Sequence, residues 1–183
     1  MPKKLIIIGG GSAGCFAAVT AAENGADVTL IEKNPSVGKK ILATGNGRCN
    51  YCHDKVTYAD LFRPEGDEFL SKVMKSFSPE DVLDRFRSLG ITPVSKDGYI
   101  YPYSEQARAV SDVLKRALAK SGVKLYTDTE VTDIVKKENV FNVICEAESL
   151  KQIPSSSLPE VKPHQIPAPT DAALISAESS DTA

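Results

Sequence analysis

The hydrophobic pattern of the first thirty-two residues predicts a strand, a helix and a second strand. The first expected strand, residues 4–8, contains the apolar run Leu5-Ile6-Ile7-Ile8, and the second, residues 27–32, contains Val28-Thr29-Leu30-Ile31 and ends in an acid. Continuous runs of this length are typical of strands in a parallel sheet that is buried on both faces. An alanine-rich stretch over residues 12–24 separates them and stops at Gly25, as a connecting helix does. The pattern predicts a βαβ unit and an α/β fold.

The middle of the chain alternates between helical and strand patterns. Apolar positions three and four apart predict helices over residues 67–77 and 79–89. Residues 91–103 are expected to form a hairpin that turns at Asp97-Gly98, because this dipeptide favours a tight primed turn. Ser104 is expected to cap a further helix. One continuous apolar stripe follows that helix: Ala107, Val110, Val113, Leu114, Ala117 and Leu118.

The last part of the chain differs in composition from the rest. Short strands are expected near residues 123–126, 131–135 and 140–145, after which prolines and serines become frequent. We therefore divide the chain into an α/β domain over residues 1–148 and a Pro/Ser-rich low-complexity tail or truncated linker over residues 149–183. We expect the tail to be disordered, with strand character only at Ala172-Ala173-Leu174-Ile175.

The turn between the first strand and the first helix has the spacing G-x-G-x-x-G, at Gly9, Gly11 and Gly14. Gly9 permits a tight turn, Gly11 lets the backbone approach a pyrophosphate, and Gly14 lets the helix pack closely on the sheet. Glu32, at the end of the second strand, is placed to accept hydrogen bonds from a ribose and to repel a 2′-phosphate. This combination predicts a dinucleotide site that suits FAD or NAD better than NADP. The alternative is a plain βαβ unit whose glycines only shape a turn.

A second glycine-rich segment, Thr44-Gly45-Asn46-Gly47-Arg48-Cys49-Asn50, follows the first βαβ unit. Its backbone N–H groups are expected to reach more of the same extended cofactor. Arg48 supplies a cation for the pyrophosphate or for the pyrimidine side of a reduced flavin. Lys39 and Lys40 either do similar work or are solvated loop lysines.

Charge and cysteine content narrow the classes of function. The 183 residues carry a net charge of only −2, which gives no basic field for nucleic acid or a membrane surface. No apolar run is long enough to cross a bilayer, and the N-terminus does not resemble a signal peptide, so a cytoplasmic location is expected. Cys49 and Cys52 form a C-x-x-C, which we interpret as coincidence rather than a redox pair. With two histidines in the chain, no metal site is expected.

The two glycine segments together resemble a known family. The stretches IIIGGGSAGCFAAVTAAENGADVTLIEKN, VGKKILATGNGRCN and DGYIYPYSEQARAV are similar to the N-terminal half of BaiN/RdsA-type flavoproteins, also known as aminoacetone oxidase-like NAD(P)/FAD-dependent oxidoreductases. The resemblance covers roughly residues 4–145. It implies an incomplete Rossmann-like FAD-binding domain of the two-dinucleotide-binding flavoprotein type.

The resemblance also implies a set of cofactor contacts and a reaction. In a complete relative, NAD(P)H would reduce the FAD, and the flavin would pass hydride to an activated carbon–carbon double bond. No catalytic residue follows from it. Tyr99, Tyr101 and Tyr103 share a face and are expected mainly to pack. The implied FAD contacts are Gly9, Gly11, Ser12, Ala13, Gly14, Glu32, Lys33, Lys39, Thr44, Gly45, Gly47, Arg48, Cys49, Asn50 and a backbone group near Val131.

This chain also departs from the family pattern. Family members are longer, with an inserted substrate domain and a final glycine-rich segment, and Leu174-Ile175-Ser176-Ala177 stands where their strand runs into A-T-G-G. Three alternatives therefore stay open. The chain is a non-catalytic fragment or a subunit that a second polypeptide completes, an NAD-dependent dehydrogenase, or part of a reductase acting on uridine in RNA.

Overall fold

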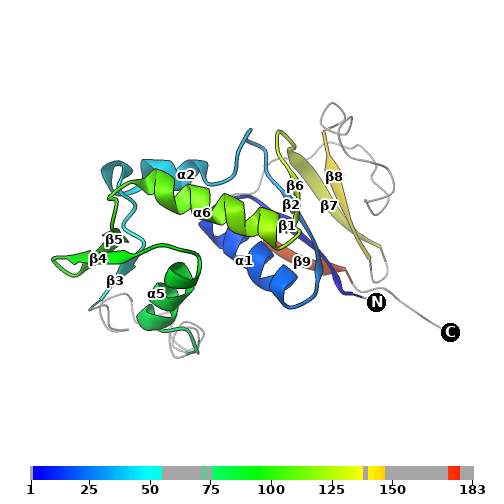
Figure 1. The fold of residues 1–183 in the computed structure, drawn as a ribbon. Coiled ribbons are helices and arrows are strands. Elements are labelled where there is room, and N and C mark those ends of the chain that lie inside the picture. Colours follow the sequence, from blue (N-terminus) through cyan, green and yellow to red (C-terminus); the bar gives the residue numbers. More distant parts are fainter. Residues whose placement is uncertain (1, 55–71, 73–75, 138–139, 147–172, 178–183) are drawn as a thin grey trace. The chain divides into compact units, whose positions relative to one another are not determined.

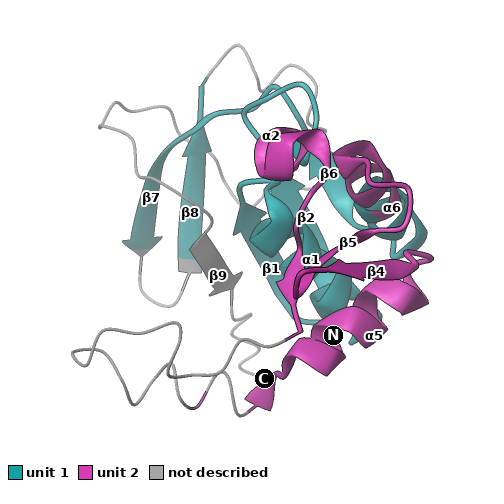
Figure 2. Cartoon of the chain, turned by 90° about the vertical axis from the view of Figure 1, so that its left-hand side faces the viewer, with its two compact units in different colours: residues 1–39, 114–183 teal, residues 40–113 magenta. Residues whose placement is uncertain are grey.

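The computed structural model describes residues 2–54, 72, 76–137, 140–146 and 173–177 (Figure 1). The chain forms two compact units, residues 1–39 with 114–183 and residues 40–113, coloured separately in Figure 2. Each unit is described by itself below. The helix expected over residues 67–77 lies mostly outside the described residues, as does most of the tail after residue 146.

The first unit contains a four-stranded sheet in the order β6-β2-β1-β9. Strands β1 (Lys4–Ile8), β2 (Asp27–Ile31) and β6 (Lys124–Tyr126) run parallel, as the largely apolar sequences of the first two predict. β9 (Ala173–Ala177) pairs with β1 in the antiparallel direction. The strand therefore begins one residue later than the sequence indicates and extends to Ala177.

Helix α1 (Ser12–Glu23) connects β1 to β2 and packs against both strands. Its buried side chains include Cys15, Ala18 and Val19, and Ile7 of β1 is almost fully buried as well. Alternate residues of a strand point to opposite faces, so Ile7 faces the helix while its neighbours face away from it. This packing confirms the βαβ unit that the hydrophobic pattern predicts.

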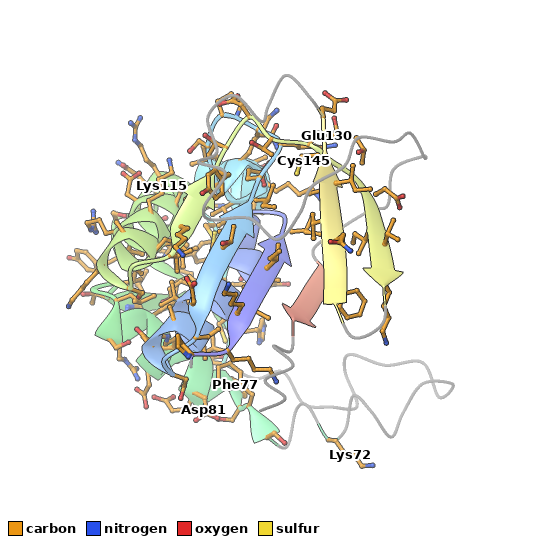
Figure 3. All side chains as sticks on the ribbon, turned by 90° about the vertical axis from the view of Figure 1, so that its right-hand side faces the viewer. Lys72, Phe77, Asp81, Lys115, Glu130 and Cys145 are labelled. Atoms are coloured by element: carbon orange, nitrogen blue, oxygen red, sulfur yellow. The ribbon has the colours of Figure 1, made fainter. Side chains whose placement is uncertain are left out.

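A two-stranded hairpin packs on the other face of the sheet. It is formed by β7 (Val131–Lys137) and β8 (Val140–Cys145), which pair antiparallel with an irregularity between Val131 and Asp133. Glu130 and Cys145, labelled in Figure 3, lie at the end of the hairpin where β7 begins and β8 ends. The shared core of the sheet and hairpin comprises Ile6, Ile31, Val143 and Cys145.

The second unit is built on a small antiparallel sheet in the order β3-β5-β4. Its strands are β3 (Cys52–His53), β4 (Pro93–Lys96) and β5 (Tyr99–Pro102). β4 and β5 form the expected hairpin, with φ of 54° at Asp97 and 87° at Gly98 in the turn. Helix α5 (Pro79–Ser88) contacts β3 and β4, and the ring centres of its Phe86 and of Tyr51 lie 4.2 Å apart.

Three further elements complete the described chain: α2 (Lys39–Ala43), the 3-10 helix η1 (Thr44–Gly47) and α6 (Ala107–Lys120). The boundary between the two units falls within α6, whose whole predicted apolar stripe is buried. The expected cap at Ser104 is wrong. Glu105 adopts a left-handed φ of 52° and donates its N–H to Pro102 O at 2.7 Å, and this turn separates Ser104 from the start of the helix.

Candidate functional site

The carboxyl edge of the parallel strands in the first unit brings three loops together. β1 continues into Gly9, β2 into Glu32, and β6 into the loop that contains Thr129. The backbone joins them: Gly9 N donates to Ile31 O at 2.8 Å, Glu32 N donates to Tyr126 O at 2.8 Å, and Thr129 N donates to Glu32 O at 3.0 Å. Open α/β sheets bind ligands at this edge, beyond the ends of the strands.

The glycine turn after β1 depends on missing side chains at three positions. Gly9 has a φ of 94°, which L side chains rarely adopt. A Cβ at Gly14 would lie 1.9 Å from Gly9 O, so the first turn of α1 can approach the β1 turn only without one. A Cβ at Gly10 would lie 2.5 Å from Val37 Cγ1. Gly9, Gly10 and Gly14 are therefore required by the fold itself.

Gly11 differs from these neighbours because a Cβ there would meet nothing within 4 Å. It is the N-cap of α1, has an ordinary extended conformation, and makes no side-chain capping bond. The first turn of α1 contains no acid, and Ser12 and Ala13 are exposed. This helix end combines free space, unsatisfied N–H donors and the positive end of the helix dipole, which is the arrangement that binds phosphate groups.

Glu32 is a buried carboxylate, only 8% exposed, held by protein donors. Its Oε2 accepts from Gly10 N at 2.6 Å, and its Oε1 accepts from Asn34 N at 2.7 Å and from Asn34 Nδ2 at 2.5 Å. A carboxylate has about four acceptor positions, so these three bonds leave room for one more donor. The bonds also compensate for the burial of the charge.

Asn34 is a site residue that sequence reasoning missed, because Asn34-Pro35-Ser36 reads only as a break between elements. Its Oδ1 accepts from Lys39 Nζ at 3.0 Å, and its backbone O accepts from Asp128 N at 3.1 Å. Its carboxamide therefore lies between Glu32 and Lys39, two residues that are predicted from the sequence to contact the cofactor. Lys33, another predicted contact, forms an ion pair with Glu130 at 3.5 Å, and both side chains are largely exposed.

The second glycine segment, in the other unit, has an unusual backbone. Gly45, Asn46, Gly47 and Cys49 all have positive φ, with values of 54°, 52°, 79° and 58°. A non-glycine residue in this region is strained, and such strain gathers at functional loops. Cys49 N donates to Thr44 O at 3.2 Å and Arg48 N donates to Gly45 O at 3.1 Å, which fixes the loop. Thr44, Gly47 and Asn50 are exposed on it.

Arg48 is the cation of this segment, and neighbouring side chains orient it. Its guanidinium carbon lies 5.3 Å from the centre of the Tyr101 ring, and Nη1 lies 3.8 Å from Glu105 Oε2. Glu105 also accepts from Lys96 Nζ, and this bond, together with the charges of Lys96 and Arg48, lowers the pKa of Glu105. With 45% of its side chain exposed, Arg48 still offers its cation to a ligand.

The three tyrosines predicted to share a face have separate surroundings. Tyr99 packs edge-on against His53, with ring centres 4.8 Å apart. Tyr101 lies beside Arg48, and Tyr103, beyond the end of β5, is 75% exposed. Val131 is half-buried at the start of β7 and packs on the core shared by the sheet and hairpin. None of these positions identifies a catalytic acid.

The cysteines are free thiols with no sign of activation. Burial raises the pKa of Cys49 and of Cys52, so neither member of the C-x-x-C has the lowered pKa of a reactive thiol. Burial, followed by the charge of Glu32, raises the pKa of Cys15 to about 12. Among the described residues, no three His, Cys, Asp or Glu side chains are grouped as metal ligands.

In the described part of the chain, no helix combines the length and apolar character that crossing a bilayer requires. The solved structure of the open conformation of a flavocytochrome c3 fumarate reductase has a similar fold, with a TM-score of 0.52 and 20% identity over 76% of this chain and 29% of that one. This similarity supports the Rossmann-like architecture.

Comparison of sequences gives a more specific relationship. A 3-dehydro-bile acid delta(4,6)-reductase from Clostridium scindens is 43% identical over 131 residues, which are 70% of this chain and 32% of the relative. A ribosomal RNA dihydrouridine synthase from Haemophilus influenzae is 30% identical over 135 residues, 73% of this chain and 33% of the relative. The chain thus spans about a third of the length of these relatives. The model of the HI0933-like protein Rossmann domain matches residues 3–158, and the chain belongs to this family.

Proposed function

We propose that this chain is the FAD-binding part of a flavin-dependent oxidoreductase. The observation that carries the proposal is the free space at Gly11, at an uncapped helix N-terminus, together with the buried Glu32 at the end of the neighbouring strand. These features lie at the same edge of one sheet. They suit the pyrophosphate and the adenosine ribose of a dinucleotide, respectively.

The residues present fit FAD. The N–H groups of Ser12 and Ala13 would bind the pyrophosphate, and Gly11 would let it approach the backbone. Glu32 has one acceptor position left for a ribose hydroxyl. A carboxylate held in this way also repels the extra phosphate of NADP, which favours FAD or NAD over NADP. In its own unit, Arg48 would supply a cation to the same cofactor, as the family resemblance implies.

The reaction we propose is reduction of an activated carbon–carbon double bond. FAD, when bound, would supply the hydride chemistry, with NAD(P)H as the reductant. This chain's residues would bind and orient the cofactor, and we assign no acid or base among them. The proposal is supported by the names of the two relatives, of which one is called a delta(4,6)-reductase and the other a synthase of dihydrouridine.

The substrate class follows from neither name. The near-zero net charge of the chain favours a small apolar enone over RNA for this portion, since nucleic-acid binding depends on basic surface. A second polypeptide that supplies a substrate site stays an untested part of the proposal. A uridine reductase is the alternative that the second relative supports.

The first experiment is the visible absorbance spectrum of the purified chain, with identification of any flavin released on denaturation. The chain is expected to bind FAD, either as purified or after addition. Gly11→Ala is expected to keep the wild-type stability, because the added methyl has free space, and to lose FAD binding, because that methyl would occupy the pyrophosphate position.

Gly25→Ala is the matched control. Gly25 lies past the other end of α1 with a φ of 84° and free space around it. The substitution should cost about 1 kcal/mol of stability through backbone strain while leaving FAD affinity unchanged. Equal FAD binding by Gly11→Ala and wild type would contradict the proposed site.

A further inference from the structure

Asn34 makes four hydrogen bonds that tie together the loops at the carboxyl edge of the sheet. Its N–H and its Nδ2 donate to Glu32 Oε1, its Oδ1 accepts from Lys39 Nζ, and its backbone O accepts from Asp128 N. The first two contacts hold Glu32, and the third joins Asn34 to Lys39. The fourth joins the loop after β6 to the loop after β2.

The charges on either side determine the orientation of the Asn34 carboxamide. Its NH₂ faces a carboxylate at 2.5 Å and its oxygen faces an ammonium group at 3.0 Å. Rotating the amide by half a turn would place oxygen against oxygen and NH₂ against NH₃⁺, with both hydrogen bonds lost. Asparagine is therefore suited to this position, since aspartate cannot donate to Glu32 when it is ionised.

The bonds to Asn34 leave only one oxygen of Glu32 available to a ligand. Oε1 already accepts two hydrogen bonds, whereas Oε2 accepts only the bond from Gly10 N. A further donor can reach the carboxylate only at Oε2, beside the glycine turn. The position of a bound ribose would thus depend on how Asn34 holds the opposite oxygen.

We propose that Asn34 is a positioning residue for dinucleotide binding, which links Lys39 to Glu32 and directs Glu32 Oε2 toward one ribose hydroxyl. This inference rests on the proposed FAD function. It assigns to Asn34 an effect on FAD affinity that depends on the hydrogen atoms of its amide, rather than only on the size of the side chain.

The test compares FAD affinity of the full chain and its variants by flavin fluorescence, at about pH 8 and about pH 5.5. Asn34→Asp keeps the shape and the acceptor toward Lys39 but places an ionised oxygen against Glu32. The variant should bind FAD about tenfold more weakly at the higher pH, because a hydrogen bond to a charged group becomes a repulsion. The difference from wild type should be smaller at the lower pH, because acidification favours a proton between two adjacent carboxyl groups and that proton would restore a donor.

The other charged groups near Glu32 are the same in the wild type and in the variant. Those on the neighbouring loops are Lys39, Asp128 and the pair formed by Lys33 and Glu130, and Lys115 acts on Cys15. Cys15, with its pKa raised to about 12 by burial and by Glu32, stays a neutral thiol over this range. The ratio of the two dissociation constants therefore isolates the effect of position 34.

Asn24→Asp is the matched control, because Asn24 is an exposed asparagine of the same unit whose Nδ2 donates to Thr20 O at 2.8 Å. It should bind FAD as the wild type does at both pH values. Asn34→Ala, which loses the amide without adding charge, should bind FAD more weakly by a factor that does not change with pH, and it tests the proposal if Asn34→Asp fails to fold.

The outcomes separate this inference from the proposed function. If the wild type binds no FAD, the proposed function is wrong and this inference with it. If the wild type binds FAD while Asn34→Asp and Asn34→Ala both retain its affinity, only the role of Asn34 is wrong. A loss in Asn34→Asp that is equal at both pH values would also overturn the inference, since it would indicate a purely structural effect.

Discussion

Gly11 and Gly14 are three residues apart, yet a methyl group would have opposite effects at the two positions. At Gly14 it would collide with Gly9 O at 1.9 Å, a backbone atom that cannot rotate away. We expect Gly14→Ala to lower the free energy of unfolding by about 3 kcal/mol, while Gly11→Ala leaves it nearly unchanged. Thermal unfolding without cofactor measures both. Equal stability of the two variants would contradict the close approach of α1 to the β1 turn.

Arg48 is expected to contribute its charge to FAD rather than to folding. Its partners Glu105 and Tyr101 are close, but the ion pair is exposed, and exposed pairs contribute little to stability. Arg48→Ala should therefore weaken FAD binding about tenfold with little change in melting temperature. Arg108→Ala removes an equally charged side chain that is 82% exposed on α6, and should leave FAD affinity unchanged. Similar affinities for the two variants would show that Arg48 does not contact the cofactor.

At the residue scale, the sequence indicates the groups with a fixed spacing and misses those positioned by tertiary contacts. The glycine turn and Glu32 follow from spacing alone, because the βαβ unit sets their geometry. Asn34 is adjacent in sequence to Glu32, but its bond to Lys39 depends on the course of the loop. The contact of Glu105 with Arg48 joins residues 57 positions apart, and no local pattern reports it.

At the scale of elements, the residues at the start of α5 form the helix cap that their sequence favours. Ser78 Oγ accepts from Asp81 N at 3.3 Å, and Asp81 Oδ2 accepts from Ser78 N at 2.6 Å, which is a capping box followed by Pro79 at the first helical position. We expect Ser78→Ala to destabilise the chain by about 1 kcal/mol near neutral pH, as measured by chemical unfolding.

The cap also has a predictable pH dependence. The hydrogen bonds from the Ser78 side chain and backbone lower the pKa of Asp81 below its ordinary value of 3.8. The stabilisation by Asp81 is therefore present above that value and is lost as the pH falls through the lowered folded-state pKa. The difference in stability between wild type and Ser78→Ala should shrink on acidification over this range. A difference that is constant down to about pH 2 would contradict the reciprocal cap.

The other helices and turns match their sequence predictions where those predictions depend on neighbouring residues alone. The Asp97-Gly98 turn has the backbone angles expected from this dipeptide, and the apolar stripe of α6 is buried as its periodicity predicts. The beginning of α6 differs from its prediction, because the left-handed Glu105 turns the chain after Ser104. A left-handed residue other than Gly or Asn leaves little signal in sequence, and its cost is met by tertiary contacts such as the bond between Glu105 and Lys96.

At the scale of the whole molecule, the composition of the chain could not predict that β9 would pair with the edge of β1. The Pro/Ser-rich tail reads as disordered, yet β9 lies within it and pairs along the whole of β1, from Lys4 opposite Ala177 to Ile8 opposite Ala173. Pairing between distant segments depends on an available strand edge, which a local window of sequence does not contain. The short apolar stretch near Ile175 is the one local signal for it.

The role of β9 can be tested by truncation. A chain that ends at residue 172 would lack β9 and leave the backbone N–H and C=O groups of β1 unpaired, next to the buried side chains of Leu5 and Ile7. We expect it to unfold at a lower temperature and to self-associate in size-exclusion chromatography, because an open edge of an apolar strand pairs readily with another chain. A chain that ends at residue 177 keeps β9 and should behave as the full chain does. If both truncated chains are monomeric and equally stable, β9 does not protect the sheet, and the edge of β1 must be tolerated without a partner.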